Sequence, residues 1–390
     1  MFSRGYSATY FLLCAVALLT MFSTSLVMPL LPIFAKGVGA AGVYIGLVVA
    51  GYWISRIVLE VPSGFISSKF GYHLPMSVGL LLTAVGSVLC AFAANPVTLI
   101  LARALMGLGA PLFFAVSMTL VVNLFDADRR GGAMGLFQGI EFMGTVVGSA
   151  FSGYVVSLFD FRASFLLSAA LVSAALLVLF VPPNVRRRSR AQVAGSAPSL
   201  SSMKAVFSNR NLLIVSSAVF AEYVMSNGIL FTIFPLYADE RLGLPLTSIG
   251  LLMGSRGIGY VVALLTMGTL SDRMGRRPVL LFGLVATAPV VIALNYATSF
   301  ALLAVVIFTI GITTGAIWIV SPVLAAEAVA PSQRGAAIGT YRTFFDLGSI
   351  LGPIIMTAVM GRWGPSPCFY LASALLLANA IPTLKIGESR

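Results

Sequence analysis

The chain has 390 residues, of which 59% are hydrophobic and 9% are charged, and its formal net charge is +12. Soluble domains usually contain about 45–50% apolar residues, whereas the mean hydropathy here is +1.01. The composition excludes a soluble globular protein. It indicates a polytopic membrane protein, because each window of about 20 apolar residues can cross a hydrocarbon core about 30 Å thick.

The apolar windows predict twelve transmembrane helices. Membrane-spanning strands are excluded, because barrel strands are about 10 residues long and alternate in polarity. The fold class expected is therefore an all-α membrane protein. In chain order the predicted spans are 9–31, 43–67, 74–94, 97–124, 132–158, 162–182, 211–237, 246–270, 278–297, 300–327, 335–360 and 367–384.

A polar segment separates these spans into two sets of six. Around residues 183–210, Pro, Ser, Gly and basic residues replace the apolar runs, as is typical of a flexible linker. We therefore expect a first six-helix bundle over 1–182, a linker loop over 183–210 and a second six-helix bundle over 211–390.

The basic residues predict the orientation. Most of the 24 Lys and Arg lie in connections that alternate to one side, and only Lys36, Arg162, Arg241 and Arg362 fall on the other. By the positive-inside rule, both termini and the linker are expected in the cytoplasm. Topology thus explains the net charge, and nucleic-acid binding is not expected.

Sequence signatures of catalysis are missing. The only histidine is His73, the three cysteines are scattered, and no CxxC, HExxH, GxxxxGK or GxSxG pattern occurs. Zinc sites, phosphate loops and nucleophile elbows require such patterns. We expect no metal, no cofactor and no enzymatic activity.

The two halves resemble each other at a shift of 204 positions. "GFISSKFG" (64–71) matches "GTLSDRMG" (268–275), and "RRGGAMG" (129–135) matches "QRGAAIG" (333–339). A constant offset across several spans predicts a duplicated six-helix unit. Two parallel six-helix halves are typical of secondary transporters that bind substrate between the halves.

Over nearly its whole length the chain resembles the major facilitator superfamily. The family's loop motif G-x-x-x-D-R-x-G-R-R is matched by Gly268, Asp272, Arg273, Gly275, Arg276 and Arg277. "RALMGLGA" (103–110) resembles its fourth-helix Arg motif, while "MPLLP" (28–32) and "GIEFMGTVVG" (139–148) resemble its drug:proton exporters. In the first-half loop copy, Gly64 and Gly71 remain, but Ser68 replaces the Asp, and Tyr72 and His73 replace basic residues.

The resemblance implies proton-coupled export of a small amphipathic or drug-like molecule by rocker-switch alternating access. The loop motif is then a gating latch. The family also implies a protein that works as a monomer in the lipid bilayer, here in a bacterial-type inner cell membrane. An uptake symporter for an organic anion, and a lipid-translocating member, stay open as alternatives.

Charged residues inside spans are costly, so they usually face a cavity or a partner. At about 1.5 Å per residue, Glu141, Glu222, Arg256 and Asp346 lie near the midplane of their spans. Desolvation favours a neutral carboxyl group and a nearby Arg favours a charged one, so Glu141, Glu222 and Asp346 are candidates for proton coupling. Glu222 is preferred, because no Arg or Lys lies on its own helix face.

Two further groups complete the candidate site. Arg103 matches the family's fourth-helix Arg, and the resemblance implies a role in proton transfer. The resemblance implies that the third, sixth, ninth and twelfth helices face lipid and that the other eight, the cavity-type helices, surround a central cavity. Aromatic and arginine side chains on the cavity-type helices could bind a substrate through stacking and charge, although aromatic residues at helical spacing also serve packing. These substrate-binding candidates are Arg256, Arg342, Tyr52, Phe113, Tyr223, Trp318, Tyr341 and Phe345.

Overall fold

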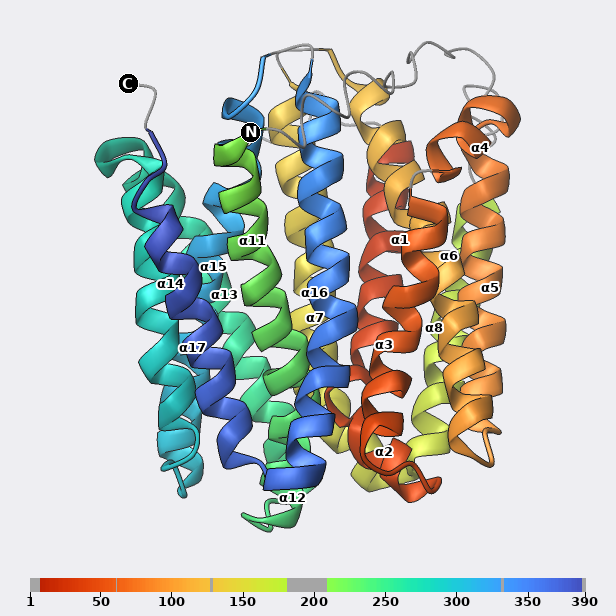
Figure 1. Ribbon diagram of the computed structural model, residues 1–390. Coiled ribbons are helices and arrows are strands. Elements are labelled where there is room, and N and C mark those ends of the chain that lie inside the picture. Colours follow the sequence, from red (N-terminus) through yellow and green to blue (C-terminus); the bar gives the residue numbers. More distant parts are fainter. Residues whose placement is uncertain (1–7, 61, 127–128, 181–208, 331–332, 388–390) are drawn as a thin grey trace. The chain divides into compact units, whose positions relative to one another are not determined.

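The computed structural model describes residues 8–60, 62–126, 129–180, 209–330 and 333–387. Within these ranges the chain is helical and contains no strand, and twelve segments are long and apolar enough to span a membrane. The helices of each half run side by side along a common direction (Figure 1). The predicted all-α membrane fold is confirmed.

The helix bounds follow the predicted spans closely. The first half contains α1 (Ala8–Ser25), η1 (Met28–Leu30), α2 (Leu31–Gly37), α3 (Val43–Glu60), α4 (Pro62–Phe70), α5 (His73–Ala91), α6 (Pro96–Leu124), α7 (Arg130–Phe159) and α8 (Phe161–Phe180). The second half contains α11 (Arg210–Met225), η2 (Ser226–Ile233), α12 (Phe234–Glu240), α13 (Leu246–Met274), α14 (Arg276–Ala293), α15 (Phe300–Glu327), α16 (Arg334–Trp363) and α17 (Ser366–Thr383).

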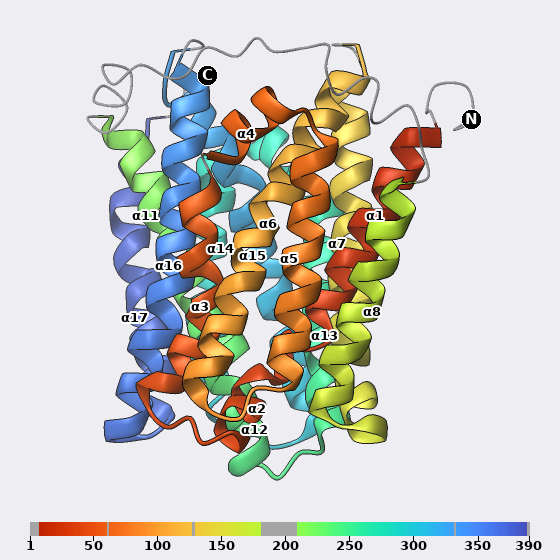
Figure 2. The same ribbon diagram turned by 90° about the vertical axis from the view of Figure 1, so that its right-hand side faces the viewer.

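Prolines divide two predicted spans. Pro29 lies in the short 3₁₀ helix η1, and Pro32 is at the start of α2. Proline lacks the N–H that a helix interior requires, so the first span is not one continuous α-helix. The predicted span 43–67 is wrong at its end, because α3 stops at Glu60 and the separate helix α4 begins with Pro62. Figure 2 shows α4 as a short helix beyond the end of α3.

Contacts between Cα atoms divide the chain into two compact units. The first unit comprises Met1–Ala40 with Gly51–Gly195, and the second comprises Ala41–Ala50 with Ser196–Arg390. The beginning of α3 thus groups with the second unit, which the expected boundaries do not anticipate. Of the expected linker 183–210, only Asn209 and Arg210 lie among the described residues, and Asn209 caps α11 by accepting a bond from the Leu212 amide.

The same helix pairs pack together in both units. In the first unit α1 packs on α7, and α5 packs on both α6 and α8; in the second unit α11 packs on α16, and α14 packs on both α15 and α17. Each pair occupies the same place in the order of spans. The packing therefore agrees with the duplication that the sequence predicts.

Glycines allow the closest helix crossings, and these crossings also repeat. A Cβ at Gly107 would lie 2.8 Å from the carbonyl carbon of Tyr52, and a Cβ at Gly311 would lie 3.0 Å from that of Arg256. Each contact is with backbone, which cannot rotate away. Small residues let helix backbones approach in this way inside membranes, so both sites require glycine.

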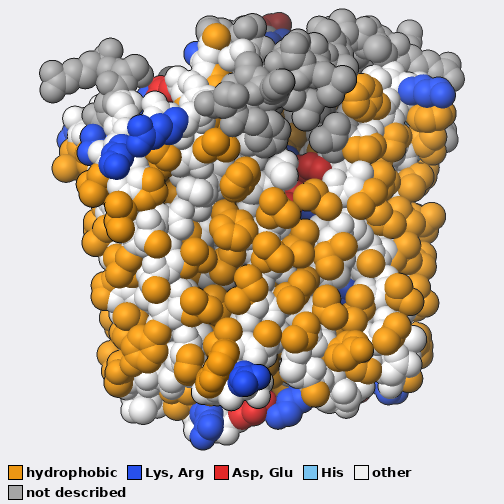
Figure 3. Space-filling view, viewed as in Figure 1, with side chains coloured by type: hydrophobic (Ala, Val, Ile, Leu, Met, Phe, Trp, Pro, Cys, Tyr) orange, Lys and Arg blue, Asp and Glu red, His pale blue; other side chains and the backbone are white. Residues whose placement is uncertain are grey.

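Large apolar side chains remain exposed along the helices, with Leu177 on α8 70% exposed and Ile381 on α17 65% exposed. Figure 3 shows apolar side chains along the length of the helices, while Lys and Arg gather near the helix ends. Such a surface suits hydrocarbon in the middle and polar headgroups at the edges.

Candidate functional site

A chain of polar side chains lies inside the second unit. The Ser226 hydroxyl donates a hydrogen bond of 2.6 Å to Glu222 Oε1, and Arg256 Nη2 donates one of 3.1 Å to Ser226 Oγ. Glu222 is 4% exposed and Ser226 is 2% exposed. The carboxyl group preferred from the sequence is therefore linked to Arg256 through a serine.

A distorted helix turn begins at Ser226. From Ser226 to Ile233 the helix widens to a π-helix, η2, a feature found frequently at functional sites. Thr232 donates a side-chain bond of 2.6 Å to the carbonyl of Asn227, five residues earlier. Asn227 Nδ2 in turn donates a bond of 3.1 Å to Ser349 Oγ on α16. Side chains thus satisfy a backbone group in the widened turn and connect it to a neighbouring helix.

Three predicted aromatic residues meet around Tyr223, which follows Glu222 in the chain. The ring centroids of Tyr223 and Phe345 are 3.8 Å apart, and Trp318 lies 6.1 Å from Tyr223 and 6.0 Å from Phe345. They come from α11, α15 and α16. Such a cluster adjoining a carboxyl group can contact both the ring and the positive charge of an aromatic cation.

The counterpart positions of the first unit, which the close crossings identify among the described residues, do not repeat this arrangement. Gly144 approaches the carbonyl of Leu18, and Gly348 approaches that of Phe220, each at 2.6 Å for a Cβ. Gly144 and Gly348 are 204 positions apart, but the residues that they contact, Leu18 and Phe220, are 202 positions apart. The first helix of each unit is therefore aligned at an offset of 202.

This alignment gives the counterparts of the polar chain. Thr20 and Thr24 of α1 correspond to Glu222 and Ser226, and the crossing at Gly107 makes Tyr52 correspond to Arg256. Thr24 donates to the carbonyl of Thr20 at 2.9 Å. At these positions only the second unit has a carboxyl group, on Glu222, and a guanidinium group, on Arg256.

Arg103 is the buried cation of the first unit. It is 2% exposed, its Nη2 donates to Met28 Sδ at 3.5 Å, and its guanidinium carbon lies 5.1 Å from the Tyr52 ring centroid. Its Nε has no hydrogen-bond partner among the described residues. No carboxylate forms an ion pair with it in that part of the chain. Thioethers and a ring are weak partners, so this charge is poorly compensated.

The remaining predicted site residues are distributed more widely. Asp346 is 1% exposed on α16, Arg342 of the same helix is partly buried, and Glu141 is partly buried on α7. Phe113 belongs to the hydrophobic core of the first unit, which favours its packing interpretation. Tyr341 is buried, and its hydroxyl has no hydrogen-bond partner among the described residues.

Arg56 Nε lies 3.3 Å from Glu60 Oε2, which is the intrahelical ion pair that their spacing allows. No group of His, Cys, Asp and Glu residues that could hold a metal ion occurs in the described ranges.

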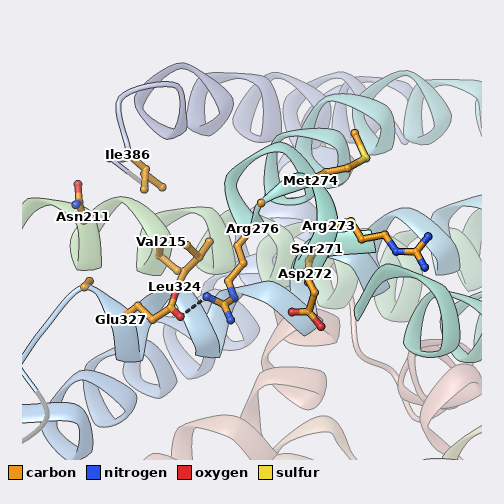
Figure 4. Close-up of a pocket in the computed structure, with 13 residues that line it drawn as sticks. Asn211, Val215, Ser271, Asp272, Arg273, Met274, Arg276, Leu324, Glu327 and Ile386 are labelled. Carbon is orange, nitrogen blue, oxygen red and sulfur yellow. Dashed lines mark hydrogen bonds and ion pairs between the residues drawn. The ribbon is translucent and has the colours of Figure 1, made fainter. Parts of the chain in front are cut away.

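The loop motif of the second unit borders a cavity of about 510 Å³ (Figure 4). Gly275 turns the chain between α13 and α14 with φ of 93°, which favours glycine. Arg276 forms an ion pair with Glu327 at the end of α15, and Figure 4 shows these two side chains pointing toward each other. Asp272 and Arg273 are exposed. The motif therefore ties α14 to α15.

The first-half copy makes the same connection without charge. Gly71 also has a positive φ, of 77°. Asn123 Nδ2 donates a bond of 2.7 Å to the Tyr72 hydroxyl, and these two residues stand 204 positions before Glu327 and Arg276. Ser68 is exposed and bonds only within its own turn, to the carbonyl of Phe65, among the contacts of the described residues.

Sequence reasoning missed Ser226, Asn227 and Ser349. Their only sequence signal is that they are small polar residues on predicted cavity-type spans. Many serines and threonines in this chain donate to a carbonyl of their own helix instead, as Ser217 does to Ile214. Contacts between helices were needed to single them out.

Comparisons with known proteins agree with this architecture. The family model described as Major Facilitator Superfamily matches residues 13–246 and 220–388. The multi-drug resistance efflux pump PmrA of Streptococcus pneumoniae serotype 4 is 27% identical, with 91% of this chain and 90% of that protein covered. The multidrug resistance protein MdtG of Proteus mirabilis is 24% identical, with 92% and 90% covered.

Two solved transporters share the fold. The nucleoside transporter NupG gives a TM-score of 0.78 at 15% identity, covering 98% of this chain and 100% of that chain. The D-xylose-proton symporter gives a TM-score of 0.79 at 16% identity, covering 97% of each chain.

Proposed function

The chain belongs to the Major Facilitator Superfamily, and on this premise we propose that it exports small amphipathic or drug-like molecules in exchange for protons. It is a membrane transporter and not an enzyme. The names of the efflux relatives support export as the direction of transport. Rocker-switch alternating access, with a monomer as the working unit, is part of the proposal.

The observation that carries the proposal is the position of Glu222. This carboxyl group is buried and is linked through Ser226 to Arg256, and the next residue, Tyr223, belongs to the aromatic cluster with Trp318 and Phe345. A proton and an aromatic cation would compete for the same negative charge. Such competition couples the inward movement of one to the outward movement of the other.

The other polar residues have assigned parts in this proposal. Arg103, Glu141 and Asp346 serve proton coupling, and Arg256, Arg342, Tyr52 and Tyr341 contribute to the substrate site. The loop motif from Gly268 to Arg277 serves gating. We place the protein in the inner cell membrane. Both termini are then in the cytoplasm, because most of the basic connections lie on their side of the membrane.

Purified protein in liposomes tests the exchange. With an imposed pH gradient, the wild-type protein is expected to move ethidium against the flow of protons, and Glu222→Gln is expected to abolish this gradient-driven movement. The control is Glu60→Gln, because Glu60 is engaged in an ion pair near the end of α3. Equal ethidium transport by wild type and Glu222→Gln would contradict the assignment of Glu222.

A second candidate function is uptake of a small organic anion together with protons. The buried, poorly compensated guanidinium of Arg103 favours it, because arginine binds carboxylates well. In the same liposomes, benzoate moving with protons while ethidium is ignored would support this function and contradict export.

A further inference from the structure

The contact between Glu222 and Arg256 is indirect. No ion pair joins their side chains in the part of the chain that the structure describes, and the Ser226 hydroxyl lies between them. Arg256 Nη2 donates to Ser226, and Ser226 donates to Glu222 Oε1. Both hydrogen bonds, from Arg256 to Ser226 and from Ser226 to Glu222, point toward the carboxylate.

We propose that Ser226 is a positioning residue that transmits the charge of Arg256 to Glu222 and reverses its hydrogen bond when Glu222 takes up a proton. This inference rests on the proposed function, since it concerns the same carboxyl group.

The chemistry of a hydroxyl group permits both states. Serine has one O–H donor and two acceptor lone pairs. While Glu222 is charged, Ser226 donates to it and accepts from Arg256, as observed. Once Glu222 gains a proton from the solution, its O–H donates to Ser226 Oγ. The serine proton then turns to the backbone carbonyl of Glu222, the i−4 acceptor that helical serines use.

The serine also explains how a buried carboxylate can take up a proton without breaking an ion pair. A direct bond between Glu222 and Arg256 would hold the carboxylate in its charged form strongly. With a hydroxyl between them, loading a proton requires rotation of one O–H group. Arg256 stays in place above Phe231, with its guanidinium carbon 5.3 Å from the ring centroid.

Other ionisable groups surround the same position. Tyr223 on α11, Arg256 and Tyr260 on α13, and Tyr341 on α16 interact electrostatically with Glu222. Helix α16 also contributes Arg342 and Asp346. Of these groups, only Arg256 is linked to Glu222 through Ser226 among the hydrogen bonds of the described residues. A substitution of Ser226 therefore isolates one connection.

Infrared spectroscopy of the purified full-length chain tests the proposal directly. The carboxyl band that Glu222→Gln removes reports the protonation of Glu222 as the pH is varied. Ser226→Ala removes a donor to the carboxylate, so the midpoint of this band is expected to rise by about one pH unit, a tenfold change in proton affinity. Ser226→Thr keeps the hydroxyl and is expected to stay near the wild-type midpoint; the equivalent position of the first unit already holds a threonine, Thr24.

A matched control lies on the same helix. Ser217→Ala removes a hydroxyl that bonds to the carbonyl of Ile214 at 2.9 Å, and it is expected to leave the band unchanged. The proposal is overturned if Ser226→Ala titrates as the wild type does, or if Ser226→Thr is displaced as far as Ser226→Ala. The band does not depend on transport. Failure of wild-type liposomes to move ethidium would therefore overturn the proposed function while the titration still decides the part played by Ser226.

Discussion

Alanine at Gly311 is expected to damage both stability and transport, because it would wedge α13 away from α15. The added Cβ would lie 3.0 Å from the carbonyl carbon of Arg256 and 3.0 Å from the amide nitrogen of Tyr260. Both are backbone atoms of one helix, so relief requires a shift of the whole helix. Overpacking of this kind costs about 1–3 kcal/mol, and the shift would also move Arg256 relative to Ser226.

Thermal unfolding in detergent and ethidium transport in liposomes measure the two effects. For a unit of this size, 1 kcal/mol corresponds to a change in Tm of about 2–4 °C, so Gly311→Ala is expected to lower Tm by several degrees. Gly107→Ala makes the equivalent contact with Tyr52 in the first unit and is expected to lower Tm similarly. For the control Gly339→Ala on α16, an added Cβ has nothing within 4 Å. Wild-type stability in Gly311→Ala, or an equal loss in Gly339→Ala, would refute the reasoning.

Three further substitutions test contacts and charges away from Glu222. Glu327→Gln removes the exposed partner of Arg276, which is expected to cost at most about 1 kcal/mol and only at low salt; Asn123→Leu removes the neutral bond to Tyr72 and is expected to lower Tm equally at low and high salt. The measurement is the Tm of each variant at low and at high salt. The distinction would be contradicted if the loss of Tm depended on salt in the same way for both variants. Arg103→Met is expected to raise Tm, because it replaces a poorly compensated buried charge with an apolar side chain, while it abolishes gradient-driven transport. A lower Tm would show that Arg103 has a strong partner.

The loop copies illustrate how structure revises a motif. From the sequence, Ser68, Tyr72 and His73 mark the first copy as degenerate. In the folded chain the connection is retained, because Asn123 and Tyr72 replace Glu327 and Arg276 at equivalent positions. The residue pair lies 51 positions apart in each half, a separation at which no local pattern predicts contact.

The sequence alone determined the membrane class, the twelve helices and the duplication, because hydropathy and spacing are local properties. It also identified Glu222 and Arg256 as costly charges inside spans, since few such residues are tolerated in hydrocarbon. What it missed depended on how one helix faces another. The offset of 202 for the first helices and the serine between Glu222 and Arg256 follow from the way the helices cross. Only the tertiary structure decided these, because a small polar side chain acquires its partner from the neighbouring helix that packing places beside it.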